Sequence, residues 1–172
     1  MTFTYSTTGY HTVKVYITDS RGCIDTFSRY HYVAVAKPDV SFSAMPTKGC
    51  APLTVYFTDN STDISGVSVN SRSWDFGDGV YHSLASATTS HYYPGAGTYY
   101  VFLKATDNVG CTDSLTKPAY IQVNKPVANF STSASNACVD QPILFYNSSM
   151  GGGLTFHWDF GDGHISTDNF PS

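Results

Sequence analysis

An internal repeat is the sequence feature that most constrains how this chain can fold. Residues 97–113 read GTYYVFLKATDNVGCTD, and residues 9–25 read GYHTVKVYITDSRGCID. The same offset of 88 residues relates Cys50 to Cys138. Self-similarity at a fixed period is the signature of a chain built from successive copies of one structural unit. We therefore predict several small related domains rather than one large domain.

A second repeated block, WDFGDG, stands at residues 74–79 and again at residues 158–163. Its offset is 84 residues, so the loop before the second copy is four residues shorter. Each block ends in Asp-Gly, which is typical of a hairpin turn because glycine adopts positive φ without steric cost. We interpret both blocks as structural hairpins that place a tryptophan in the core. The motif residues are Trp74, Asp75, Gly77, Asp78, Gly79, Trp158, Asp159, Gly161, Asp162 and Gly163.

The repeats set the expected domain boundaries. Residues 38–125 form one complete repeat, residues 1–37 correspond to the C-terminal part of a domain, and residues 126–172 to the N-terminal part of another. Trp74 precedes Gly97 by 23 residues, and joining residue 172 to residue 1 of a following copy reproduces that spacing. We interpret the chain as one period of an array in which residues 1–37 of a following copy complete residues 126–172. The alternative is that the boundaries are arbitrary and the match is a coincidence.

Alternation of apolar and polar residues predicts β-strands along the chain. Val101, Leu103 and Ala105 fall on one face of their segment, and their neighbours fall on the other. Lys-Pro pairs at residues 37–38 and 125–126 end the last strand of a repeat, since proline cannot continue a strand ladder. The prediction is an all-β chain of tandem immunoglobulin-like β-sandwich domains, with about seven strands each, stacked end to end with almost no linker.

Charge and composition exclude several kinds of partner. The net charge is −4, and no clustered Lys/Arg face is present, so nucleic acid is not an expected partner. No window of 18 consecutive apolar residues occurs, so we expect neither a membrane span nor a signal peptide. Four cysteines without CxxC spacing favour disulfides in an oxidising compartment. We therefore expect an extracellular location, at the cell surface or secreted.

The motifs resemble those of polycystic kidney disease (PKD) repeats. The resemblance is carried by the two WDFGDG blocks, by Gly-Thr-Tyr and the following Thr-Asp-Asn, and by Asp-Asn-Ser at residues 59–61. It implies an immunoglobulin-like sandwich of the kind found in bacterial surface proteins, in gliding-motility adhesins and as accessory domains of secreted proteases and chitinases. The Gly-Cys pairs resemble those of long type IX-secreted surface proteins of gliding bacteria. His11 departs from the intact repeat, which has Tyr99 at that position.

The four cysteines are expected to pair across domain junctions. In a sandwich of this type, the loop between the last two strands lies at the end where the domain begins, and the loop between the first two strands lies at the opposite end. Cys23 and Cys50 are then too far apart for a disulfide, whose Cα atoms are about 4.4–6.8 Å apart. We expect Cys50 to pair with a copy of Cys23 further along the array, and Cys111 to pair with a copy of Cys138 before it. The alternative is that all four are unpaired buried thiols.

The carboxylates of the two WDFGDG blocks have three interpretations. Asp75, Asp78, Asp159 and Asp162 can hold backbone N–H groups of their own turns, bind calcium, or form a carboxylate pair for glycoside hydrolysis. We favour the turn and keep calcium as the alternative; no other cofactor is expected. No Ser/His/Asp set, phosphate-binding glycine loop or metal-spaced histidine cluster is present. We therefore expect no catalytic residues and no enzyme activity.

The function predicted from these features is a non-catalytic structural and adhesive repeat of an extracellular stalk or filament. Its expected partners are neighbouring copies of the same repeat, joined head to tail. Surface glycans or other filaments are further candidate partners, because several aromatic side chains are predicted to point outward: Tyr16, Tyr30, Tyr32, Tyr92, Tyr100 and Phe102. The alternative is an accessory module of a secreted enzyme that degrades polysaccharide or protein. A dedicated carbohydrate-binding module is a third possibility.

Overall fold

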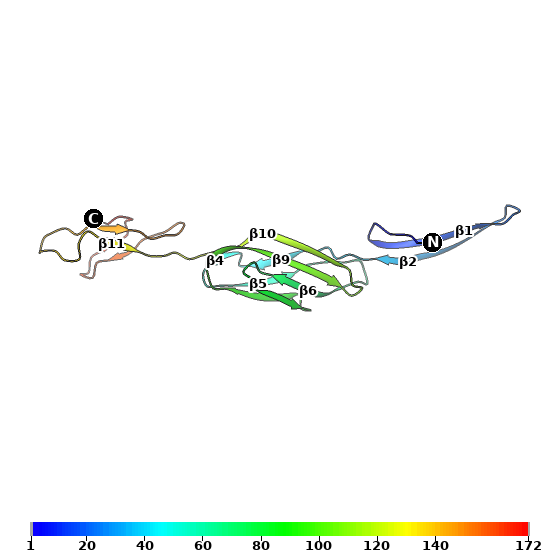
Figure 1. The fold of residues 1–172 in the computed structure, drawn as a ribbon, viewed down its shortest axis with the longest axis horizontal. Coiled ribbons are helices and arrows are strands. Elements are labelled where there is room, and N and C mark those ends of the chain that lie inside the picture. Colours follow the sequence, from blue (N-terminus) through cyan, green and yellow to red (C-terminus); the bar gives the residue numbers. More distant parts are fainter. Residues whose placement is uncertain (1, 172) are drawn as a thin grey trace.

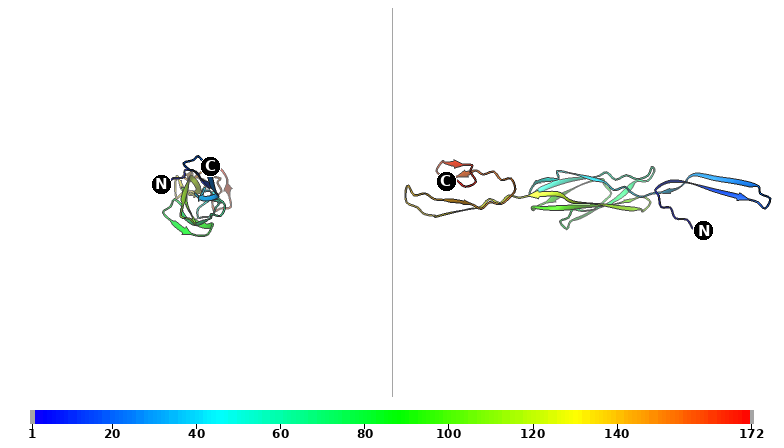
Figure 2. Two further views of the ribbon diagram at one scale, coloured as in Figure 1. Left: turned by 90° about the vertical axis from the view of Figure 1, so that its right-hand side faces the viewer. Right: turned by 90° about the horizontal axis from the view of Figure 1, so that it is seen from above.

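The computed structural model describes residues 2–171, which form fourteen β-strands and no helix. The strands fall into three segments that lie in one line (Figure 1). We call residues 2–37 the leading hairpin, residues 38–125 the middle sandwich and residues 126–171 the trailing half-sandwich. Figure 2 shows that the three segments overlap when viewed along the long axis, so the molecule is a narrow rod. The all-β prediction is confirmed. Within the described residues, no helix could cross a membrane.

The middle sandwich consists of two sheets packed face to face. The smaller sheet has the strand order β3 (Phe42–Met45), β5 (Leu53–Asp59), β8 (Thr88–Tyr93). The larger sheet has the order β4 (Lys48–Cys50), β10 (Thr112–Asn124), β9 (Gly97–Asp107), β6 (Val69–Asp75), β7 (Tyr81–Leu84). All pairs are antiparallel except β4 with β10, which run parallel.

The first strand of the predicted seven is divided between the two sheets. Pro46 follows β3 directly, and proline has no N–H with which to continue the ladder to β5. The chain therefore crosses to the edge of the larger sheet, where β4 pairs with the end of β10. The backbone N–H of Gln122 donates to the carbonyl of Thr47 at 2.9 Å, and that of Ala51 donates to Asn124 at 2.8 Å. Because one strand is split, eight strands are found where seven were predicted.

The core of the middle sandwich is aromatic at its centre. Val101, Leu103 and Ala105 on β9 are fully buried, as the alternation predicted. In the ladder Leu103 lies opposite Trp74, which is itself almost completely buried. The ring centroids of Trp74 and Phe42, which lie on opposite sheets, are 5.2 Å apart in an edge-to-face arrangement. The tryptophan of the first WDFGDG block is therefore a core residue.

A buried ion pair ties the two sheets together. The Arg72 guanidinium on β6 donates to the Asp59 carboxylate on β5, and it also donates to the carbonyl of Ala85 at 2.6 Å. Both charged side chains are almost completely shielded from solvent. Removing one partner of such a pair leaves an uncompensated buried charge, so the two residues constrain how the sheets face each other.

The leading hairpin consists of β1 (Gly9–Thr18) and β2 (Ile24–Val35). It repeats the register of β9 and β10: Val15 lies opposite Phe27, as Leu103 lies opposite Leu115. The backbone irregularity on the second strand is also repeated, with positive φ at His31 (51°) and at its counterpart Ala119 (49°). The hairpin therefore has the local geometry of the last two strands of an intact sandwich.

The trailing half-sandwich contains four short strands in two separate pairs. They are β11 (Phe130–Thr132) with β12 (Phe145–Asn147), and β13 (Trp158–Asp159) with β14 (Ile165–Ser166). By the offsets of 88 and 84 residues they correspond to β3, β5, β6 and β7 of the middle sandwich. The trailing segment thus contains counterparts of the strands that begin a sandwich.

Two contacts brace the junction between the leading hairpin and the middle sandwich. The Lys37 ammonium lies 3.0 Å from the Asp113 carboxylate, and the Tyr10 hydroxyl donates to the Ser65 carbonyl. The hydrogen bond from Lys37 holds the pKa of the Asp113 carboxyl below its ordinary value, and the backbone N–H of Ser114 adds to this effect. The strand β2 ends at Val35, so the connecting segment is short.

We expect Leu103→Ala to lower the free energy of unfolding of the middle sandwich by about 2–5 kcal/mol, because it removes buried methyl groups beside Trp74 and leaves a cavity. Urea unfolding followed by tryptophan fluorescence measures the change. Lys104→Ala, one residue along on the outer face of β9, is the matched control and should change the stability by less than about 0.5 kcal/mol. Equal losses in the two variants would contradict the assigned core.

We expect Lys37→Ala to raise the pKa of Asp113 toward its ordinary value, since the principal hydrogen bond to the carboxylate is lost. A depressed pKa stabilises the folded form above the ordinary pKa, and the contribution is lost as the pH falls through the lowered value. NMR titration of the Asp113 carboxyl measures the change, with Lys14→Ala as the control. An unaltered Asp113 titration in Lys37→Ala would show that the junction contact is not formed in solution.

Candidate functional site: two half-built sandwich cores

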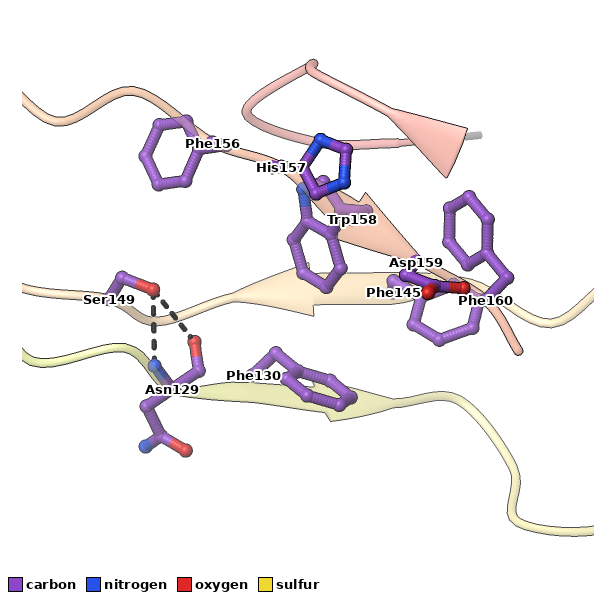
Figure 3. Close-up of a pocket in the computed structure, with 9 residues that line it drawn as sticks. All are labelled: Asn129, Phe130, Phe145, Ser149, Phe156, His157, Trp158, Asp159 and Phe160. Atoms are coloured by element: carbon purple, nitrogen blue, oxygen red, sulfur yellow. Dashed lines mark hydrogen bonds between the residues drawn. The ribbon is translucent and has the colours of Figure 1, made fainter. Parts of the chain in front are cut away.

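The trailing half-sandwich exposes an open aromatic groove. A cavity of about 220 Å³ is lined by residues that include Phe130, Phe145, Trp158 and Phe160. Figure 3 shows Trp158 of β13 pointing toward Phe130 of β11 and Phe145 of β12, with Phe160 beside Phe145. Phe130 is 56% exposed, whereas its counterpart Phe42 in the middle sandwich is 1% exposed. The trailing segment therefore presents an incomplete core, with parts of both sheets, to solvent.

The rings of this groove are already arranged as in the intact core. The centroids of Phe145 and Phe160 are 5.1 Å apart, the same separation as between their counterparts Phe57 and Phe76. Trp158 and Phe160 are stacked with an interplanar angle of 10°, where the corresponding pair of the middle sandwich has 3°. The half-core is thus formed without the strands that cover its counterpart.

The leading hairpin exposes the core-facing side of the counterparts of β9 and β10, two strands of the larger sheet. Val15 is 52% exposed, whereas its counterpart Leu103 is completely buried. Val13, Ile17 and Phe27 are similarly exposed. Val13, Val15 and Ile17 alternate along β1 and therefore share one face. Phe27 lies opposite Val15 in the antiparallel ladder, which places it on that face as well.

The segment before β1 keeps the aromatic contacts of β8 with β9. The ring centroids of Tyr5 and His11 are 4.6 Å apart, and those of their counterparts Tyr93 and Tyr99 are 4.5 Å apart. The ring nitrogen Nε2 of His11 bonds the Thr7 carbonyl at 3.0 Å, as the Tyr99 hydroxyl bonds the corresponding carbonyl at 3.2 Å. Histidine therefore replaces tyrosine at this position without loss of the packing or of the hydrogen bond.

Several strands of the trailing segment are short or unformed where their partners are missing. Within the described part of residues 126–172, no strand corresponds to β8, β9 or β10. β13 has two residues where β6, which pairs with β9, has seven. Residues 136–138, which correspond to β4, form no strand, because β4 is held only by β10. A strand needs a hydrogen-bonded neighbour, so these differences follow from the missing half.

The first aspartate of each WDFGDG block holds its own turn. The Asp75 carboxylate accepts the backbone N–H of Gly77 at 2.9 Å, and the Asp159 carboxylate accepts that of Gly161 at 2.9 Å. Gly77 has a φ of 80°, and a Cβ atom there would lie 2.5 Å from the backbone oxygen of Tyr100. Glycine is required at this position for both reasons.

The second aspartate of each block also accepts a turn N–H, from Val80 to Asp78 at 3.2 Å and from His164 to Asp162 at 3.0 Å. The bond from His164 holds the pKa of Asp162 below its ordinary value. Gly79 and Gly163 follow at positive φ. Across residues 2–171, no three His, Cys, Asp or Glu side chains come together in a group that could hold a metal ion.

The four cysteines lie at the ends of segments. Cys50 ends β4, close to the trailing half-sandwich, and Cys111 lies between β9 and β10, at the end of the middle sandwich near the leading hairpin. Cys23 lies at the turn of the leading hairpin, and Cys138 lies in the loop between β11 and β12. All four thiols are free. Partial burial, together with the nearby Asp107 carboxylate, raises the pKa of the Cys111 thiol. Pairing across junctions stays a prediction.

The aromatic residues predicted to point outward mostly do so. Tyr16, Tyr30, Tyr32, Tyr92 and Tyr100 are exposed, and Phe102 is half-buried because it lies in the ladder opposite Asp75. Binding of glycans or of other filaments to these side chains stays a prediction.

Two side-chain contacts of the middle sandwich were not predicted from the sequence. One is the cross-sheet pair of Arg72 and Asp59, and the other is the contact of His91 Nε2 with the Asp78 carboxylate at 2.7 Å. A titratable residue at a core-facing position of a strand, Arg72 or His91, is the signal that marks each pair. The partner in each case depends on how the sheets face each other, which strand periodicity does not report.

Comparison with known proteins places this fold in a family. A family model described as PKD domain matches residues 35–123. Among solved structures, the PKD1 domain of Vibrio anguillarum Epp is 31% identical, with 51% of this chain and 95% of that domain covered and a TM-score of 0.42. The PKD1 domain of Vibrio cholerae metalloprotease PrtV is 28% identical, with 50% and 98% covered and a TM-score of 0.41.

A structure of carbohydrate-binding modules from the β-sandwich superfamily is 23% identical, with 63% of this chain covered and a TM-score of 0.48. The chain spans about half of that structure, with 52% covered. The family match includes the middle sandwich up to residue 123, with its WDFGDG hairpin, and extends over more than half of the sequence. The chain therefore belongs to the PKD domain family.

Proposed function

We propose that this chain is a non-catalytic segment of an extracellular stalk or filament, in which immunoglobulin-like domains follow one another in a single line. The observation that carries the proposal is the path of the chain: it enters and leaves the middle sandwich at opposite ends and continues along the same axis on both sides (Figures 1 and 2). PKD domains are in general non-catalytic modules and occur in extracellular or secreted proteins. A surface protein of a gliding bacterium, exported by type IX secretion, is the setting we favour.

The strand arrangement suits a segment that carries tension. Force applied along the rod enters the middle sandwich ahead of β3, at the end near the leading hairpin, and leaves it at the end of β10, near the trailing half-sandwich. β4 and β10 run parallel and are joined by pairs from Lys48 with Gln122 to Cys50 with Asn124. Pulling the two ends apart loads these hydrogen bonds together, in shear, rather than one after another. The Lys37–Asp113 contact provides a further link between neighbouring segments.

A second candidate function is an accessory module of a secreted enzyme that degrades polysaccharide or protein. Tyr30 and Tyr32 are exposed on β2, and the Arg29 guanidinium lies 4.7 Å from the Tyr32 ring centroid. Such a surface can stack on sugar rings. The number of repeats encoded by the complete gene distinguishes the two functions. Many successive repeats would support the stalk, and one or two repeats beside a catalytic domain would support the accessory module.

We expect dilute solutions of the chain to scatter X-rays as a rod. A compact domain of 172 residues has a radius of gyration of about 16 Å, and the linear arrangement requires a clearly larger value. Small-angle scattering, extrapolated to zero concentration, gives the radius of gyration and the cross-section. A value near that of a compact domain would contradict the proposed linear stalk.

A further inference from the structure

We propose that the trailing half-sandwich of one copy of this chain is completed by the leading hairpin of a second copy, so that copies join head to tail. The inference deepens the proposed function and rests on it in one respect, namely that successive segments continue along one axis. The two exposed faces have complementary strand content, since one has counterparts of β3, β5, β6 and β7 and the other has counterparts of β9 and β10. Together they contain the main strands of a sandwich.

One chain cannot make this contact with itself. The trailing half-sandwich and the leading hairpin lie at opposite ends of the rod, with the middle sandwich between them (Figure 1). The leading hairpin of the same copy is therefore out of reach, and the covering segment in this proposal is the leading hairpin of a second copy. A contact between two different surfaces of identical chains leaves one surface free at each end, so it continues into an open filament rather than closing a dimer.

The middle sandwich gives the register of the contact. Trp74 lies opposite Leu103 in the β6–β9 ladder, so Trp158 lies opposite Val15 of the second copy. The adjacent pair brings Asp159 opposite Lys14 of the second copy, where the middle sandwich pairs an aspartate with a phenylalanine. Opposite charges at directly opposed positions of a ladder favour pairing, and this pair is specific to the contact between copies.

The segment before β1 supplies the missing edge strand. His91 on β8 stacks on Phe76 with a centroid distance of 4.3 Å, and the Tyr93 hydroxyl donates to the Phe76 carbonyl at 3.0 Å. The corresponding residues of the second copy are Phe3 and Tyr5, which meet the ring and the carbonyl of Phe160. Both aromatic positions of the strand are thus retained.

Phe3 replaces His91 at this position, and His164 replaces Val80 in the turn that it faces. In the middle sandwich, Asp78 binds the His91 imidazole across the sheets. Phe3 cannot take that role. Its would-be partner Asp162 instead lies 3.2 Å from Nδ1 of His164, which stands where the middle sandwich has Val80. The carboxylate therefore has a local partner where the second copy brings a phenylalanine.

The junction between the middle sandwich and the trailing half-sandwich contains space for the incoming hairpin. A cavity of about 520 Å³ is lined by Cys50, Lys125 and the loop from Gly151 to Thr155. In the middle sandwich, the loop that contains Cys111 lies against the equivalent loop, where the backbone N–H of Asn108 donates to Ser68. The turn of the second copy's hairpin, which contains Cys23, is thus directed into this cavity beside Cys50.

The same geometry places Cys138 of the first copy beside Cys111 of the second. Each pair forms a disulfide when two thiols lose two protons and two electrons to glutathione disulfide, which is reduced to two molecules of glutathione. Lys125 corresponds to Lys37 and meets Asp25 of the second copy, as Lys37 meets Asp113. Two disulfides and two ion pairs, Lys125 with Asp25 and Asp159 with Lys14, then connect successive copies.

Sedimentation velocity of the full 172-residue chain over a wide dilution series tests the inference. The expected result is a mass that rises with concentration beyond the dimer. Val15→Asp places a carboxylate against Trp158 in the contact, and we expect it to weaken association by at least about 100-fold. Val15 is exposed in the single chain, so the unfolding of the middle sandwich should not change. Tyr16→Asp, on the opposite face of β1, is the matched control and should associate as the unmodified chain does.

Mixing two variants tests the head-to-tail arrangement. Val15→Asp disables the leading face, and Phe160→Asp disables the trailing face. Each variant alone should be monomeric, and the equimolar mixture should stop at a one-to-one dimer. Dimers of Phe160→Asp alone would show that leading hairpins pair with each other, which overturns the inference. A monomeric unmodified chain at every concentration, or an equal loss in Tyr16→Asp, also overturns it.

Oxidation with glutathione disulfide tests which cysteines of neighbouring copies lie close enough to form disulfides. Non-reducing electrophoresis of the associated chain should show a ladder of multimers that disappears on reduction. Cys50→Ser alone should leave the ladder, because Cys138 still pairs with Cys111, and Cys50→Ser with Cys138→Ser should abolish it. A ladder that persists in the double variant contradicts the register. These outcomes are separate from the scattering of the dilute chain, so the inference can fail while the linear stalk remains.

Discussion

Pairing of β9 with the strand that carries the tryptophan is the constraint on which the structure depends. In the middle sandwich, β9 pairs with β6 and places Leu103 beside Trp74 in the aromatic core. Around that contact the other strands reach their full lengths, and two charged residues are buried as a pair. Where this neighbouring strand is missing, as beside Trp158, the aromatic rings still pack together, but the strands are shorter than in the middle sandwich. Packing across the sandwich, and not local propensity, is what extends these strands.

Much of the fold was predictable from the repeat. Two copies of one pattern, in register over most of their length, reveal which residues play the same role. Val101, Leu103 and Ala105 were therefore assigned to the core from alternation alone, and the family resemblance was confirmed. The split of the first strand was not predicted, since it depends on an edge of the second sheet that is built from residues far along the chain.

The candidate site was only partly predictable for the same physical reason. Strand periodicity tells which face of β1 is apolar, but it does not tell whether a neighbour covers that face. Val15 and Leu103 have the same pattern in sequence and opposite environments in the structure. The buried partners Arg72 and Asp59 were missed because the contact is made between sheets. Exposure of a core-like face is a property of the assembly, which only three-dimensional packing reveals.

A permuted chain in which residues 126–172 are followed immediately by residues 1–37 provides the most direct test. If the two segments are halves of one domain, this permuted chain should fold by itself. Its unfolding by urea, followed by tryptophan fluorescence, should then be a single cooperative transition with a denaturant dependence similar to that of residues 38–125. Val15→Asp in the permuted chain should abolish that transition. A permuted chain without cooperative unfolding, with Trp158 as exposed to quenchers as in a denatured chain, would contradict the account.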